Sequence, residues 1–187
     1  MLKREFVLPI EYCPICGAKG TFRVKGRIDD IPYFGETMET LAACSSCKFK
    51  HADVTHLGEH EPMRHEFLIT SEDDMMVRVV RSSTGTMKVP ELGVTVKPCS
   101  ASEGYVTNIE GVLNRIENAI RLAIEQADPT RRRRGESKLK KLEAIRRGEA
   151  RAKLIMMDPF GHSAIADGRA KKRKLTKKEL AKLKSEL

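Results

Sequence analysis

Apolar residues in the first 100 positions of the chain fall in short runs that are typical of β-strands. Such runs occupy residues 21–25, 67–70, 76–81 and 92–96. In the third run, Val77, Val79 and Arg81 share one face, while Arg78 and Val80 share the other. Because apolar residues occupy both faces, we expect a strand that is buried in part on each side. Pro32 argues against a long helix in the first region.

From residue 107 the apolar spacing changes to that of a helix with one core-facing stripe. The stripe consists of Ile109, Val112, Leu113, Ile116, Ile120 and Ile124. Thr107 and Glu110 have the spacing of a capping box, and Asp128-Pro129 is expected to end the helix. A second helix is expected over about 136–154. The sequence therefore predicts a helical hairpin at about 107–154, inserted in a β domain that spans residues 59–168.

The charge of the chain is concentrated in its C-terminal third. Residues 131–187 carry 20 Lys and Arg against 7 Asp and Glu, a net charge of +13, whereas residues 1–130 carry 15 against 19, a net charge of −4. Residues 169–187 contain a basic cluster followed by the start of a short helix, and we expect this tail to be disordered until a partner binds. Two charge blocks could contact a polyanion: Arg131, Arg132, Arg133 and Arg134, and then Lys171, Lys172, Arg173 and Lys174.

Four cysteines are the strongest chemical signal. Cys13 and Cys16 form one Cys-x-x-Cys pair, Cys44 and Cys47 form a second, and 27 residues separate the pairs. Two residues between thiolates let one turn aim both sulfurs at a single ion, so the spacing predicts one structural zinc ion in a Cys₄ ribbon over residues 1–58. Gly17 supplies the freedom to adopt a positive φ that such a turn often needs.

Two disulfides, or two redox pairs, are the alternatives for these cysteines. The charged start of the chain, residues 1–6, does not resemble a secretory signal, and Cys99 would be left unpaired in an oxidising compartment. We therefore favour zinc and a cytoplasmic location. No apolar run of 18 residues is present to span a membrane. Four thiolates leave no open position on zinc, and no phosphate-binding loop is present, so we expect no enzyme activity.

Several motifs, in order along residues 10–166, resemble those of the ZPR-type zinc-finger proteins. They are Cys13-Pro-Ile-Cys16-Gly17, Ile31-Pro32-Tyr33-Phe34, the 82–91 stretch SSTGTMKVPE, Thr107-Asn-Ile-Glu-Gly111, and the turn Asp158-Pro-Phe-Gly-His-Ser163. Eukaryotic members carry the ribbon and its following domain twice, whereas this chain carries them once, as in the single-module archaeal form. His162 stands where the family favours Asn, and the basic tail lies outside the match.

The resemblance implies a mainly β fold with an α insertion, in which a zinc ribbon precedes a β-helix-like barrel that carries a helical hairpin. It also implies binding to translation elongation factor 1-alpha, whose folding the eukaryotic members assist. Candidate partner-binding residues are Ile31, Pro32, Tyr33, Phe34, Pro90, Glu91, Asp158, Gly161 and Ser163. Two of these groups have a structural alternative, since the aromatic pair could instead pack the ribbon onto the next domain and the 158–163 segment could close the β domain as a turn.

A nucleic-acid-binding module is the competing hypothesis. In that case the ribbon is a scaffold and the basic C-terminal region contacts RNA without reading its sequence. The net negative charge of residues 1–130 argues against the ribbon itself as a polyanion-binding surface.

Overall fold

The computed structural model describes residues 4–32, 34–58, 61–99 and 101–187. The N-terminal region is one antiparallel sheet with strand order β1-β2-β3-β4. Its strands are β1 (Arg4–Tyr12), β2 (Lys19–Ile31), β3 (Gly35–Cys44) and β4 (Lys50–His56). The long β2–β3 hairpin pairs without a register shift from Phe22 with Cys44 to Ile31 with Gly35. The expected strand at residues 21–25 thus lies inside the longer β2.

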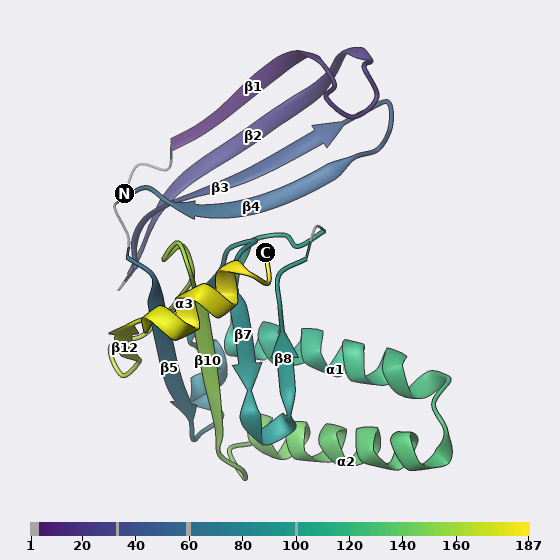
Figure 1. The fold of residues 1–187 in the computed structure, drawn as a ribbon, viewed down its shortest axis with the longest axis vertical. Coiled ribbons are helices and arrows are strands. Elements are labelled where there is room, and N and C mark those ends of the chain that lie inside the picture. Colours follow the sequence, from purple (N-terminus) through teal and green to yellow (C-terminus); the bar gives the residue numbers. More distant parts are fainter. Residues whose placement is uncertain (1–3, 33, 59–60, 100) are drawn as a thin grey trace.

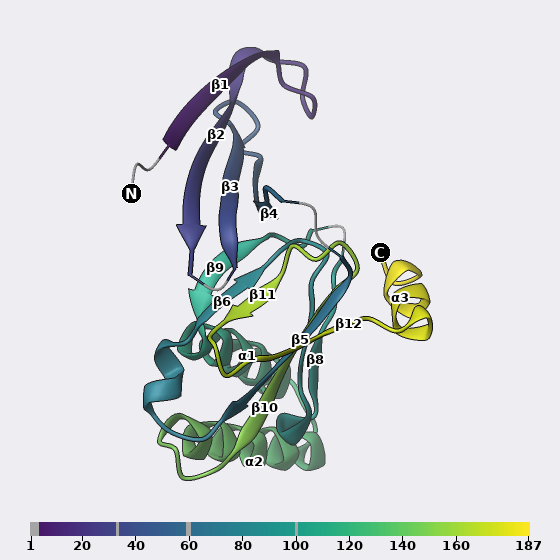
Figure 2. The ribbon, with the colours of Figure 1, turned by 90° about the vertical axis from the view of Figure 1, so that its left-hand side faces the viewer.

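The second region is built from two further antiparallel sheets, with strand orders β12-β5-β10-β7-β8 and β11-β6-β9 (Figures 1 and 2). The larger sheet contains β5 (Met63–Ile69), β7 (Thr86–Val89), β8 (Val94–Val96), β10 (Ala152–Asp158) and β12 (Lys171–Lys174), and the smaller contains β6 (Arg78–Arg81), β9 (Tyr105–Asn108) and β11 (Ala164–Ala166). Short 3₁₀ turns, η1 (Asp73–Met76) and η2 (Pro90–Leu92), connect some of them. The expectation of a mainly β fold with an α insertion is confirmed.

One apolar core holds this second region together. Phe67, Val79, Leu113 and Met156 are each at most 1% exposed and belong to the same cluster, although they come from both sheets and from α1. Val80, the neighbour of Val79, is also fully buried but packs in a different cluster on the opposite face of β6. The alternation in residues 76–81 therefore predicted burial on both faces correctly.

The helical hairpin consists of α1 (Ile109–Glu125) and α2 (Pro129–Arg146), and it extends to one side of the sheets (Figure 1). Its boundaries differ from those expected. Asn108, rather than Thr107, caps α1, because the Asn108 side chain accepts a hydrogen bond from the Gly111 amide. Asp128 caps the start of α2 through the amides of residues 130 and 131, so α2 begins directly after the turn and not near residue 136.

The basic tail is ordered, and the expectation that residues 169–187 are disordered was wrong. Strand β12 pairs with β5, from Lys171 opposite Glu66 to Lys174 opposite Met63. Helix α3 (Lys177–Lys184) follows, and Thr176 and Glu179 form the capping box that starts it. Figure 1 shows α3 lying across the outside of the five-stranded sheet. The local pattern predicted the helix start, but it carried no sign of the surface that the helix covers.

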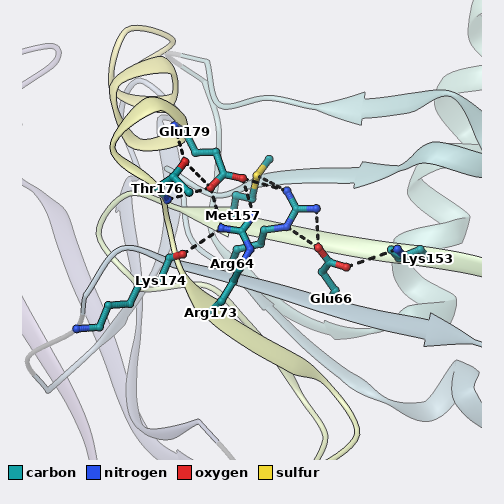
Figure 3. Close-up of polar contacts among 8 residues, drawn as sticks. All are labelled: Arg64, Glu66, Lys153, Met157, Arg173, Lys174, Thr176 and Glu179. Carbon is teal, nitrogen blue, oxygen red and sulfur yellow. Dashed lines mark hydrogen bonds and ion pairs between the residues drawn. The ribbon is translucent and has the colours of Figure 1, made fainter.

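Charged side chains secure this tail to the sheet (Figure 3). Glu179 of α3 accepts hydrogen bonds from Arg173 of β12, at 2.6 and 2.8 Å, and from Arg64 of β5 at 3.3 Å. Arg64 also pairs with Glu66 at 2.6 Å. Below this network, Leu183 is 5% exposed and packs with Ile155, Met157 and Leu175 in a small cluster of its own.

Candidate metal centre and interaction surfaces

The four cysteines of the two pairs meet at one end of the N-terminal sheet. The turn between β1 and β2 carries Cys13 and Cys16, and the turn between β3 and β4 begins at Cys44 and carries Cys47. Their sulfur atoms all lie within 4.8 Å of one another, and the Cys16 and Cys44 sulfurs are 3.9 Å apart. A tetrahedral site with Zn–S bonds of about 2.3 Å separates its sulfurs by about 3.8 Å. The donor set and its spacing therefore fit one zinc ion.

The backbone of each turn explains why the sulfurs converge. Gly17 has a φ of 72°, as the sequence predicted, and its amide donates to the Cys13 carbonyl at 2.8 Å. The second turn uses Lys48 at the equivalent place, with a φ of 64°, which is uncommon for a residue with a side chain. Its ammonium group donates to the Ser45 carbonyl at 3.0 Å across the turn.

The surroundings of the sulfurs shift the pKa of Cys44 and that of Cys47 in opposite directions, and the pKa of Cys47 is raised to about 11 beside the other three sulfurs. Cys13 and Cys44 are buried with Phe22 in a small cluster, and Cys16 and Cys47 are exposed. The hydrogen bond between the Thr21 hydroxyl and the Cys44 sulfur lowers the pKa of Cys44 to about 6. All four are free cysteines, without a disulfide between them. Because all four thiols are available as ligands, the site can close around an ion without an open position, which is the character of a structural site.

The opposite end of the N-terminal sheet rests on the second region. Ile31 and Val54 pack against Val80 of β6, and Phe34 lies at the edge of this cluster. Asp53 accepts hydrogen bonds from the Ser83 amide and hydroxyl, both at 3.0 Å. Two of the aromatic-loop candidates, Ile31 and Phe34, are thus engaged in packing the two regions together, which was the structural alternative. Pro32 is exposed, and Tyr33 lies outside the described residues.

The 158–163 segment forms a buried polar cluster. Asp158 is fully buried and accepts a hydrogen bond from the Ser82 hydroxyl at 2.6 Å, and it also bonds to the hydroxyls of Thr84 and Ser163. Gly161 closes the turn with a φ of 74°. These contacts join the 82–84 loop to the end of β10, as a turn that closes the domain would do.

The remaining candidates lie on the surface or near it. Pro90 and Glu91 form the turn η2, where the Glu91 carboxylate accepts from the Lys153 amide at 2.9 Å. The four arginines 131–134 lie exposed in the first turns of α2. Lys171 to Lys174 are exposed along β12, where Lys174 pairs with Glu61 and Arg173 with Glu179. The two basic blocks lie on different elements, because residues 131–134 belong to α2 and residues 171–174 form β12 at the edge of the five-stranded sheet.

A closed four-cysteine site on a β ribbon, joined to a two-sheet β domain with a helical hairpin, defines a zinc-finger protein whose metal serves structure. The family model of the ZPR1 jelly-roll domain matches residues 73–186. Two archaeal relatives cover most of the chain. A ZPR1-like protein of Methanocaldococcus jannaschii is 41% identical over 173 residues, which are 92% of this chain and 87% of the relative. A ZPR1-like protein of Pyrococcus horikoshii is 42% identical over 175 residues, which are 91% of this chain and 78% of the relative.

A eukaryotic relative has a name that states a role. The zinc finger chaperone zpr1 of Schizosaccharomyces pombe is 28% identical over 160 residues, which are 82% of this chain but 34% of the relative. The chain belongs to the ZPR1 family. Among the described residues, no helix is long and apolar enough to cross a membrane.

Proposed function

We propose that this protein is a zinc-dependent interaction factor that binds translation elongation factor 1-alpha in the cytoplasm and assists its folding without catalysing a reaction. The observation that carries the proposal is family membership across both regions of the chain, together with a relative that is named a chaperone. The motif resemblance supplies the identity of the partner. The zinc ion would act by holding the shape of a protein-binding surface.

The ribbon offers a surface that suits such a partner. Twelve large apolar residues are exposed in the part of the chain that the structure describes, and seven of them belong to residues 4–58. Val7, Leu8, Ile10 and Tyr12 are 40–54% exposed along β1, which has a strand neighbour on one side only. Exposed apolar clusters on a soluble domain commonly mark sites of protein contact, and an open strand edge can accept a partner's backbone. We therefore propose β1 as the principal contact.

The test measures capture of purified elongation factor 1-alpha by the immobilised, zinc-loaded protein. Ile10→Lys and Leu8→Lys place a charge on the proposed surface, and Cys44→Ser removes a zinc ligand. Leu122→Lys is the matched control, because Leu122 is 71% exposed but lies on α1. We expect each ribbon variant to weaken binding at least about tenfold, because the lysines bury an unpaired charge at the proposed contact and the serine removes a zinc ligand, and we expect the control to bind as wild type does. Wild-type protein that fails to retain the factor would overturn the proposal.

RNA binding is a second candidate, and one observation favours it. Arg131 to Arg134 stand at the N-terminal end of α2, where the helix dipole disfavours cations by a few tenths of a kcal/mol each. A bound polyanion would offset this unfavourable electrostatic energy. Replacing these four arginines with glutamine should then reduce affinity for a single-stranded RNA and flatten its salt dependence. Unchanged affinity in the variant, or a salt-independent one in the wild type, argues against this function.

A further inference from the structure

An apolar cavity lies between the β7–β8 hairpin and helix α1. Its volume is about 570 Å³, within the range of roughly 300–1,000 Å³ that is usual for pockets that bind small molecules. Met87, Val94 and Val96 line it from the strands, and Ile116, Ala119 and Ile120 line it from α1. Gly104 and Tyr105 also line it, where the chain enters strand β9.

Two guanidinium groups line this cavity and stand near the same aromatic ring. Arg81 projects from β6 and is 4% exposed, and Arg115 projects from α1 and is exposed. The ring of Tyr105 lies 5.7 Å from the guanidinium carbon of Arg81 and 4.2 Å from that of Arg115, measured to the ring centroid. Both arginines and the tyrosine line the cavity. The cavity therefore combines an apolar body with a cationic end.

The hydrogen bonds of Arg81 leave its charge without a counter-ion. Its Nε donates to the Gly85 carbonyl at 3.0 Å, and its Nη1 donates to the Glu103 carbonyl at 3.3 Å. Nη2 is shielded from solvent and has no acceptor among the described residues. The exposed Glu103 carboxylate also borders the cavity, but in the described part of the chain neither Arg81 nor Arg115 forms an ion pair.

A buried cation with only neutral acceptors destabilises the protein, and a second cation near the same ring adds repulsion. An anion bound beside Arg115 would offset the positive charge that the two groups create at this end of the cavity. A carboxylate matches this need, because it accepts two parallel hydrogen bonds from a guanidinium and carries one negative charge. Arg115 is open to such a group directly. Nη2 of Arg81 is covered, so Arg81 acts on the anion through its charge.

We propose that this cavity binds a small amphipathic carboxylic acid, whose apolar body fills the space between α1 and the β7–β8 hairpin while Arg115 holds its carboxylate beside Tyr105 and the positive charge of Arg81 favours an anion there. A cavity of this size with a single cationic end favours a free small molecule over an extended peptide. None of the residues that line the cavity belongs to residues 4–58, and the proposal does not depend on elongation-factor binding.

The test titrates the full, zinc-loaded chain with decanoate, below the concentration at which it forms micelles, and follows binding by calorimetry and by amide shifts in NMR spectra. Arg115→Gln removes one cation, and Ala119→Phe fills the cavity from an exposed helix position. Arg121→Gln is the matched control, because Arg121 lies on α1 but does not line the cavity. We expect about tenfold weaker binding for Arg115→Gln, loss of binding for Ala119→Phe, and a change of less than about twofold for the control.

Comparison ligands with other head groups decide the chemical class. Decyltrimethylammonium and 1-decanol should bind far more weakly than decanoate, with amide shifts that spare residues near Tyr105. Equal affinity for all three would mean that the arginines take no part and would overturn the proposal. Tighter binding of decyl phosphate would overturn the choice of a carboxylate. Binding of N-acetyl-leucyl-leucine in place of decanoate would assign the cavity to the end of a protein chain, and no binding of decanoate would refute the site.

Discussion

The docking of helix α3 on the sheet can be tested by removing the side chain that anchors it. Leu183→Ala deletes most of a side chain that is 5% exposed and packs against Ile155 and Met157. Buried Leu→Ala substitutions cost about 2–5 kcal/mol, and we take the lower value, about 2 kcal/mol, because this cluster is small and lies at the surface. A helix of 8 residues is marginal in isolation, so the lost free energy should appear as local release of α3.

Hydrogen exchange measured by mass spectrometry reports on that release. A loss of about 2 kcal/mol should speed exchange about 30-fold for amides within residues 177–184, while β5 and β10 keep their protection. Leu187→Ala is the control, because Leu187 is 55% exposed and its truncation should change nothing. The reasoning is refuted if these amides already exchange in the wild type as fast as in an unstructured peptide, or if both variants behave alike.

Three further outcomes are expected. Chelation of zinc should remove stabilisation on the order of 10 kcal/mol from the ribbon. Residues 1–58 should therefore become sensitive to protease before the remainder of the chain. Unchanged circular dichroism after verified metal removal would contradict this expectation. Burial, together with the charge of Lys172, lowers the pKa of His65 to about 4. The unfolded chain, with a histidine pKa near 6.5, therefore binds more protons at this group than the folded protein does between pH 6.5 and 4. The free energy of unfolding should fall by about 2 kcal/mol from pH 7 to pH 5 through this group. Urea unfolding at both pH values should show a smaller fall for His65→Gln, and an equal fall would exclude His65 as the cause. Finally, Gly135→Ala should destabilise the helical hairpin by about 1 kcal/mol, although alanine has the higher helix propensity. The reason is that the added methyl group would overlap the Ile124 side chain of α1. A raised melting temperature of the variant would contradict this packing.

The metal site could be predicted from sequence because its determinants are local. Each Cys-x-x-Cys pair closes one turn, and the requirement for positive φ at Gly17 is visible in the residue type. Lys48 adopts the same backbone region without such a signal, and the sequence offered no means to expect it. The two turns meet because the β2–β3 hairpin sets them side by side.

The tail could not be predicted because its partners are distant in sequence. Arg64 and Glu179 are 115 residues apart, and the apolar surface below α3 comes from β10. Viewed locally, the residues of the tail show mainly positive charge, which is typical of disorder. The order of the tail therefore depends on a surface that exists only after the sheet has formed.

The cationic cavity was missed although one signal was available. The strand pattern placed Arg81 on the same face as Val77 and Val79, and both valines are buried. A cation on a core-facing stripe is unusual and points to a neutralising partner inside the protein or bound to it. The position of Tyr105 and Arg115 around that cation depends on the pairing of β6 with β9, which local periodicity does not reveal.

The place of β10 in its sheet has a consequence for synthesis of the chain. β10 lies between β5 and β7, so these two strands have no shared neighbour until residues 152–158 are available. A ribosome-bound chain that ends before this segment would expose the apolar face of β5 and leave unpaired three strand edges that the complete sheet pairs, two of β5 and one of β7. Such edges promote association between chains, and contacts across large sequence separations form slowly. A member of a family with a named chaperone would thus itself be most prone to aggregation late in its own translation.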